Sequence, residues 1–91
     1  QGVAEFADQA SLFLGIAELR LSRLPEARQN FERAAAGEAS WRVPATYYLG
    51  VIAFQEGRYD DAVLHFEEVA QAQPGTDIGR EASVFLAAID K

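Results

Sequence analysis

The sequence contains no cysteine and no methionine. Without cysteine the chain has neither disulfide bonds nor thiolate metal ligands, and this absence is compatible with the cytoplasm and with the periplasm or cell envelope alike. The compartment therefore stays open. Because the sequence begins at Gln1 and has no methionine, we expect it to be a piece of a longer protein.

Clustered basic residues and long apolar runs are also missing. The chain has 8 basic residues against 14 acidic ones, for a net charge of −6, and the basic residues are scattered along it. A nucleic-acid interface needs clustered positive charge, so no nucleic-acid partner is expected. No apolar run reaches the roughly 18 residues of a membrane span, so direct membrane insertion is not expected either.

Groups that carry catalysis are few. The one histidine, His65, directly precedes an aromatic core position, so on a helix we expect it to point away from the core and to be a solvated surface residue. Adjacent acidic residues such as Asp60 and Asp61 diverge by about 100° on a helix and cannot converge on one cation. Neither glycine-rich phosphate-binding motif occurs. The sequence predicts no enzyme, no cofactor and no metal site.

Apolar residues, in contrast, make up 49% of the 91 residues, which is enough for one domain with a buried core. Two stretches repeat one pattern at an offset of 35 residues, in which a Leu-Gly pair is followed by alanine and then by phenylalanine. The copies are Leu14-Gly15, Ala27 and Phe31, and Leu49-Gly50, Ala62 and Phe66. Each copy predicts a helical hairpin in which glycine lets a second helix approach closely and phenylalanine fills the gap.

Apolar spacings of three and four residues predict the first helix from about Val3 to Leu21. Its expected core residues are Phe6, Ala10, Phe13, Leu14, Ala17 and Leu21. The second helix is predicted to begin at Pro25, where a proline is tolerated in the first turn, and to end before Gly37.

The third helix is predicted to start with Ser40 as its N-cap and to end at Gly57, followed by a fourth helix over 59–72. Thr76 is the expected N-cap of a last helix over about 77–90. The predicted organisation is one all-α domain over residues 1–91, made of hairpins 3–36 and 40–73 and a terminal or capping helix 77–90.

The repeated unit resembles the tetratricopeptide repeat, whose pattern is Trp-x2-Leu-Gly-x2-Tyr, then Ala-x3-Phe, then proline. The second copy matches it at Leu49-Gly50, Ala62, Phe66 and Pro74. The departures are at the Trp position, held by Ser11 and Thr46, and at the Tyr position, held by Glu18 and Ala53. The resemblance implies an α-solenoid of antiparallel helix hairpins, with about five helices forming two full repeats plus a terminal helix.

The same resemblance implies that the first helix of each hairpin lines a concave groove that holds a segment of a partner protein. The corresponding positions here are Gln9, Leu12, Ile16, Leu19, Pro44, Tyr47, Val51 and Phe54. Their apolar stripe is additional to the core set, which indicates either partner binding or packing against neighbouring repeats. Chaperone-binding members hold a carboxylate with Lys, Arg and Asn at such positions, and because these residues are absent here, chaperone tails are disfavoured.

A second resemblance concerns the bacterial cell envelope. The run from Ala45 to Gly50, with Pro74-Gly75-Thr76 and Ala82, is similar to the repeats of outer-membrane assembly lipoproteins and of the periplasmic coordinator of the Tol-Pal system. This resemblance implies a periplasmic or membrane-associated parent protein.

Three functional hypotheses follow. The first is a protein-interaction scaffold that binds a partner segment in the apolar groove. The second is homo-oligomerisation, in which the groove of one copy receives the terminal helix of another through its Phe85 and Ile89 face. The third is a docking appendage of an enzyme encoded elsewhere in the parent chain.

Overall fold

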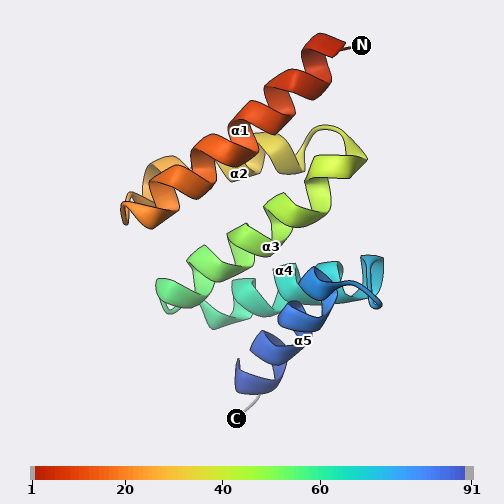
Figure 1. Cartoon of the computed structure of the whole chain (residues 1–91). Helices are drawn as coiled ribbons and strands as arrows, with labels where there is room; N and C mark the ends of the chain where they lie inside the picture. The colour runs from red at the N-terminus through yellow and green to blue at the C-terminus, as the bar shows by residue number, and fades with distance from the viewer. Residues whose placement is uncertain (1, 90–91) are drawn as a thin grey trace.

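The chain folds into helices only, as far as it is described. The computed structural model describes residues 2–89, and within this range it contains five helices and no strand. Figure 1 shows their order, which is α1 (Gly2–Arg20), α2 (Leu24–Ala35), α3 (Ala39–Gln55), α4 (Tyr59–Ala72) and α5 (Asp77–Ile89). The predicted all-α class with five helices is confirmed. The expected end of the last helix, Asp90, lies outside the described residues.

The helices form two layers. In Figure 1, α1, α3 and α5 lie toward the viewer, and α2 and α4 lie behind them. Each back helix packs both against the front helix that precedes it and against the one that follows. This is a stack of helical hairpins, α1 with α2 and α3 with α4, closed by α5 on one end.

Each hairpin is held together by one glycine and one phenylalanine. A Cβ atom at Gly15 would lie 2.8 Å from the ring of Phe31, and one at Gly50 would lie 2.8 Å from the ring of Phe66. Both phenylalanines are fully buried. A methyl group at either glycine would therefore overlap the ring, which confirms the role predicted for the Gly and Phe positions of the repeat.

The two hairpin turns use the same hydrogen bonds with different residues. The Arg23 amide donates to the Glu18 carbonyl, and the Arg58 amide donates to the Ala53 carbonyl, both at 2.8 Å. Such a turn after a helix needs one residue with positive φ. Gly57 takes this role in the second hairpin, with φ of 79°, as predicted, whereas Ser22 takes it in the first, with φ of 62°.

The starts of α3 and α5 differ in how they are capped. The predicted cap of α5 is confirmed, because the Thr76 hydroxyl accepts a hydrogen bond from the Gly79 amide at 3.2 Å. The predicted cap of α3 is wrong, because the N-cap is Glu38, two residues before Ser40, and α3 begins at Ala39. The Glu38 amide donates to the carboxylate of Asp8 on α1, at 2.8 Å, so one amide at this helix end is satisfied by the preceding hairpin.

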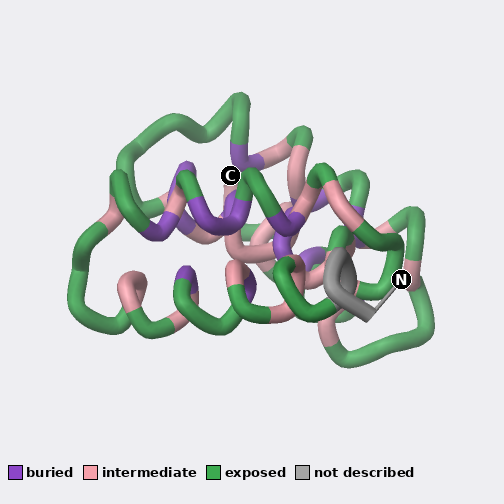
Figure 2. The backbone as a smooth tube through the Cα atoms, turned by 90° about the horizontal axis from the view of Figure 1, so that it is seen from above, coloured by how far each residue is buried: buried purple, intermediate pink, exposed green. Residues whose placement is uncertain are grey.

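The expected core face of α1 is also wrong. The residues predicted to be buried, Phe6, Ala10, Phe13, Leu14, Ala17 and Leu21, are exposed. The side of α1 that faces α2 and α3 carries Leu12, Gly15, Ile16 and Leu19 instead. Figure 2 shows the consequence, since the α1 backbone alternates between exposed and buried or half-buried stretches. In α3 the equivalent positions contact the hairpin that precedes it. No described residue lies at the corresponding place beside α1.

None of the helices among the described residues combines the length and the apolar character needed to cross a bilayer.

Candidate functional site

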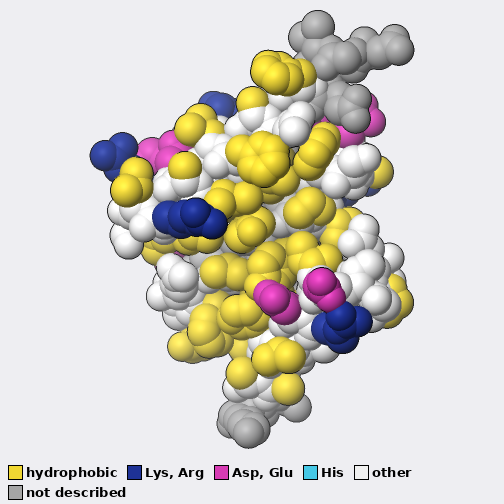
Figure 3. All heavy atoms as spheres, viewed as in Figure 1, with side chains coloured by type: hydrophobic (Ala, Val, Ile, Leu, Met, Phe, Trp, Pro, Cys, Tyr) yellow, Lys and Arg dark blue, Asp and Glu magenta, His cyan; other side chains and the backbone are white. Residues whose placement is uncertain are grey.

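An open depression lies on the front layer between α1 and α3. It has a volume of 620 Å³, and its lining residues are Phe13, Ile16, Ala17, Arg20, Leu21 and Tyr48. We call it the α1–α3 groove. Figure 3 shows that hydrophobic side chains gather on this face of the molecule, over α1 and the α3 region below it.

Aromatic contacts support both walls of the α1–α3 groove. The ring of Tyr48 on α3 stacks on the buried ring of Phe31 on α2, with centroids 5.0 Å apart and planes 10° apart. Phe13 on the opposite wall is 54% exposed and meets Trp41 edge to face at 6.3 Å. The Tyr48 wall is therefore backed by the buried core, whereas the Phe13 wall is supported by one edge contact.

Arg20 provides the one charge in the groove. It is exposed and lies in the last turn of α1. Within the described part of the chain, Arg20 takes part in no ion pair. Its guanidinium is therefore available to a carboxylate brought by a partner.

Of the residues predicted to line a groove, those on α1 are placed unequally. Leu12 is 4% exposed and belongs to the buried core with Phe31 and Leu49, so its predicted place on the surface is wrong. Gln9, Ile16 and Leu19 are half-buried. Ile16 is the one predicted residue that also lines the α1–α3 groove.

The predicted residues on α3 are largely taken up by α5. Tyr47, Val51 and Phe54 are half-buried and pack with the hydrophobic cluster that joins α3, α4 and α5. Phe85 of α5 is the central member, because its ring meets those of Tyr47 and Phe54 edge to face, at 6.2 Å and 5.3 Å. The same ring stacks on Phe66 at 4.5 Å. Pro44 is half-buried inside α3.

A polar contact ties the same helices together. The Tyr47 hydroxyl donates a hydrogen bond of 2.6 Å to the Glu81 carboxylate of α5. Burial, together with this hydrogen bond and the nearby negative charge, raises the pKa of Tyr47 above its ordinary value, so the hydroxyl keeps its proton. In the second hairpin the front face is therefore filled by the chain's own terminal helix.

This packing bears on the self-association hypothesis. Phe85 and Ile89, the residues expected to enter another copy, pack against α3 and α4 of their own chain. The Phe85 and Ile89 face is therefore partly used within its own chain, and entry of this face into another copy stays a prediction.

Sequence reasoning missed five of the six residues that line the α1–α3 groove. Phe13, Ala17 and Leu21 were assigned to the core, and Arg20 and Tyr48 were not predicted to line a groove. The offset of 35 residues could have identified Phe13, because it aligns with Tyr48 of α3, which lies between two hairpins. A residue that stacks on a preceding hairpin in one repeat is exposed wherever that neighbour is missing.

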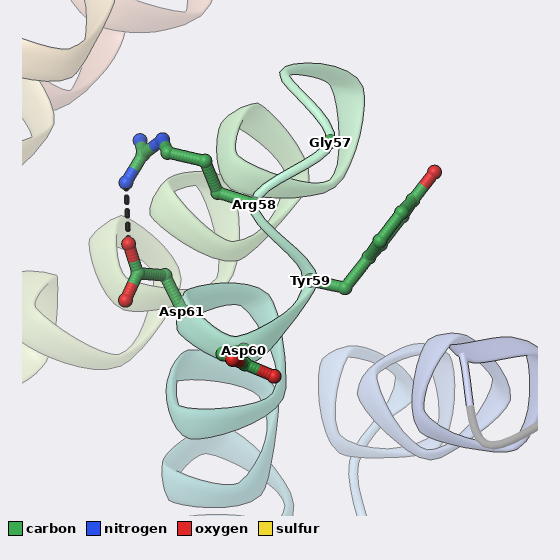
Figure 4. Close-up of a pocket in the computed structure, with 5 residues that line it drawn as sticks. All are labelled: Gly57, Arg58, Tyr59, Asp60 and Asp61. Carbon is green, nitrogen blue, oxygen red and sulfur yellow. Dashed lines mark hydrogen bonds and ion pairs between the residues drawn. The ribbon is translucent and has the colours of Figure 1, made fainter.

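A second recess lies at the turn between α3 and α4, and Figure 4 shows it in close-up. It has a volume of 390 Å³ and is lined by Gly57, Arg58, Tyr59, Asp60 and Asp61. Arg58 donates hydrogen bonds to Asp61 at 2.6 Å and to Glu56 at 2.8 Å. Tyr59 points away from this pair (Figure 4). Arg58 and Asp61 are thus engaged in ion pairs at the turn, and the recess lining contains no nucleophile next to a base.

His65 on α4 is half-buried, so the expectation of a solvated histidine is wrong in degree. Burial lowers the pKa of His65 below its ordinary value, which favours the neutral imidazole. Across the described residues, no group of three or more His, Asp or Glu side chains is arranged to hold a metal ion.

The fold and the groove define a class, the helical-repeat proteins in which stacked hairpins expose one face of their first helices. Two models of the tetratricopeptide repeat family match the chain, one over residues 2–44 and the other over residues 43–76. The chain belongs to the tetratricopeptide repeat family. Repeats of this family mediate protein–protein interaction and are typically non-catalytic. No curated protein and no solved structure matches the chain.

Proposed function

We propose that this chain is an interaction module that holds an apolar segment of a partner protein in the α1–α3 groove. The observation that supports this function most is the groove itself, an open, mostly apolar depression with an aromatic ring on each wall. Exposed apolar side chains gathered in one concave place are typical of interaction sites rather than of free surface.

The chemistry of the lining selects the segment. Phe13, Ile16 and Leu21 offer apolar contact, and Arg20 at the end of α1 offers one positive charge. The matching ligand is a short segment with two or three large apolar side chains and one Asp or Glu beside them. The acidic residue fits Arg20 alone, because it is the one charged residue in the groove lining.

The expected affinity is moderate. Three large apolar side chains contribute roughly 1.5–3 kcal/mol each when fully buried, so about 5–9 kcal/mol in all. An ion pair at an exposed rim adds at most about 1 kcal/mol. Since association costs at least about 4 kcal/mol, the net free energy is at most about 6 kcal/mol, which corresponds to dissociation constants of tens of micromolar or weaker.

The test is selection of random 12-residue peptides displayed on phage against the folded chain. The expected result is enrichment of peptides that combine apolar residues with an acidic residue. Titration of a selected, fluorescently labelled peptide then measures its affinity for wild type and for Arg20→Glu, which reverses the one groove charge. We expect Arg20→Glu to weaken binding by about tenfold, because attraction becomes repulsion.

The matched control is Arg23→Glu, which makes the same change at another exposed arginine, in the turn after α1 and outside the groove lining. It is expected to leave affinity within about twofold of wild type. A second variant, Tyr48→Ala, removes one groove wall and is expected to weaken binding more than Arg20→Glu does. Equal affinity of wild type, Arg20→Glu and Tyr48→Ala for the selected peptides would refute groove binding.

A further inference from the structure

A second apolar surface lies on α1, on the side turned away from α2. We call it the outer face of α1, and its residues are Phe6, Ala10, Phe13, Leu14, Ala17 and Leu21. Its four large side chains are between 53% and 70% exposed. None of the six is charged. The outer face meets the α1–α3 groove along Phe13, Ala17 and Leu21, but Phe6 and Leu14 do not line the groove.

The internal repeat shows what covers such a face. At the offset of 35 residues, the outer face of α1 corresponds to the α3 residues Trp41, Ala45, Tyr48, Leu49, Ile52 and Glu56. The first five belong to, or pack against, the hydrophobic cluster that joins α3 to α1 and α2. On α3 the equivalent surface is thus the interface with a preceding hairpin, whose back helix is α2.

The contacts of α2 with α3 give the chemistry of this interface. Phe31 of α2 stacks on Tyr48, and its alanine neighbours Ala27 and Ala34 are fully buried in the same cluster. At the edge, Arg28 of α2 forms an ion pair of 3.4 Å with Glu56, the C-cap residue of α3. The α2 side is therefore an Ala-x3-Phe-x2-Ala stripe with a basic residue at one edge.

The outer face of α1 changes one part of this pattern. Tyr48 is matched by another aromatic residue, Phe13, so a partner phenylalanine in the position of Phe31 could stack on Phe13. Glu56 is matched by Leu21, so an arginine in the position of Arg28 would have no acid to pair with. The partner of the outer face should carry an apolar residue in that position.

We propose that the outer face of α1 binds an amphipathic helix of the α2 type, which places a phenylalanine over Phe13, small residues on either side of it, and an apolar residue over Leu21. This interface continues the stack by one helix beyond α1. It shares Phe13, Ala17 and Leu21 with the α1–α3 groove, and Phe6, Ala10 and Leu14 are the residues that distinguish the two surfaces.

A second folded copy of this chain cannot supply such a helix. The stripe of α2 is covered by α3, and the corresponding surface of α4 is covered by α5. The face of α5 with Ala82 and Phe85 is used against α4 in turn. Among the described helices, none has a free Ala-x3-Phe-x2-Ala stripe, so the occupant is a different helical segment.

The probe for a test is a synthetic peptide with the sequence of Leu24–Ala36, carrying Arg28→Leu to match Leu21. A hydrocarbon staple between positions 29 and 33, both exposed in α2, holds the isolated peptide helical. Fluorescence anisotropy measures its affinity for the 91-residue chain, and amide chemical-shift changes in two-dimensional NMR locate it. We expect a dissociation constant of roughly 10–100 μM and shifts centred on residues 6–14 of α1.

Matched variants decide whether the outer face is responsible. Leu14→Glu and Phe6→Glu replace exposed side chains on this face, so each leaves the fold intact, and each is expected to weaken binding by about tenfold. Leu64→Glu makes the same change at an equally exposed leucine of α4 and is expected to stay within about twofold of wild type. A peptide with Phe31→Ala should bind about tenfold more weakly, and one that keeps Arg28 should bind several-fold more weakly.

Several outcomes would overturn the proposal. These are absence of measurable binding of the probe, equal binding to Leu14→Glu and wild type, and shifts centred on Ile16 and Arg20, which would assign the peptide to the α1–α3 groove. Sedimentation equilibrium could give one more such outcome. A dimer that Leu14→Glu dissociates would show that a second copy covers the outer face.

Discussion

The two repeats carry the same pattern but occupy different places in the stack. α3 packs against α2 on one side and α4 on the other, whereas the outer face of α1 is exposed and meets α3 at its edge, where Phe13 contacts Trp41. Leu49 is buried and its counterpart Leu14 is exposed, although the sequence around both reads Leu-Gly. The spacing of apolar residues therefore predicts which faces of a helix are apolar. Which of these faces are buried depends on the neighbouring helices in the stack.

One difference between the interiors of the two hairpins concerns a polar pair. In the first hairpin the Asn30 side-chain amide donates a 2.7 Å hydrogen bond to the Glu18 carboxylate. In the second hairpin the equivalent positions are held by His65 and Ala53. The carboxylate therefore has no counterpart, and the His65 imidazole is half-buried. Substituting each residue by its counterpart in the other repeat therefore measures what that position contributes to the free energy of unfolding.

The largest expected difference concerns the buried phenylalanines. Phe66→Ala should lower the free energy of unfolding by about 4–5 kcal/mol and Phe31→Ala by about 3–4 kcal/mol, as is usual for truncation of a buried ring. The excess at Phe66 arises because its ring also loses Tyr47 and Phe85, whereas Phe31 loses Tyr48. Urea unfolding followed by circular dichroism measures both, and a larger loss for Phe31→Ala would contradict the comparison.

The hairpin turns allow a reciprocal swap. Ser22→Gly should raise the free energy of unfolding by about 0.5–1 kcal/mol, because serine at positive φ is strained and glycine is not. Gly57→Ser should lower the free energy of unfolding by about 1 kcal/mol. The cause is backbone strain at positive φ alone, since a Cβ atom at Gly57 would meet nothing within 4 Å. Thermal denaturation of the two variants is the measurement. Changes of the same sign would show that the turns are not equivalent.

The His65 position predicts a smaller effect that depends on pH. Its folded-state pKa lies below the ordinary 6.5, because burial outweighs the opposing charges of Glu68, Asp61 and Glu32, and Arg58 adds to the lowering. The unfolded state therefore binds a proton first as pH falls. The stabilising contribution of the neutral ring is complete above about pH 6.5 and is lost as pH falls through the folded-state pKa.

Replacement by the residue of the first repeat isolates this contribution. His65→Asn should give a flatter dependence of unfolding free energy on pH between about 7 and 5, while both proteins share the carboxylate titrations below that range. Denaturant titrations at four pH values measure the difference between the two curves. Parallel curves would indicate that the histidine has the same pKa in both states.

The smallest expected effect is at Trp41, whose counterpart in the first repeat is Phe6. The Nε1 atom of Trp41 is buried and has no hydrogen-bond partner among the described residues. Trp41→Phe loses apolar contact but also removes an unsatisfied donor, so the two terms offset and the net change should stay within about 1 kcal/mol. Circular dichroism at 222 nm follows unfolding without the tryptophan. A loss of more than about 2 kcal/mol would mean that the indole is bonded in solution.

The sequence was sufficient for the fold because its decisive contacts are local to each hairpin. The separation along the chain is the same between Gly15 and Phe31 as between Gly50 and Phe66. The repeat of 35 residues therefore predicted both hairpins. The turn at Gly57 and the cap at Thr76 were predictable for the same reason, since a single residue type satisfies each. The cap of α3 was not, because Asp8 reaches it from another helix.

The candidate site was predicted only in part, because it depends on contacts between hairpins. A period of three and four residues places Leu12 and Leu14 on different faces of α1 but does not say which face meets a neighbour. Likewise, Tyr47 and Phe54 have the spacing of groove residues, and α5 fills their surface with Phe85. Which of several apolar faces is covered is a property of the whole stack, and one helix pattern does not contain it.

Equivalent positions of α1 and α3 differ in burial because α1 has an uncovered face. Native-state hydrogen exchange of the chain, read amide by amide over residues 10–17 and over their counterparts 45–52, measures this difference. We expect faster exchange throughout the α1 segment, since fewer packed neighbours hold it closed. Equal protection of the two segments in the monomer would contradict it.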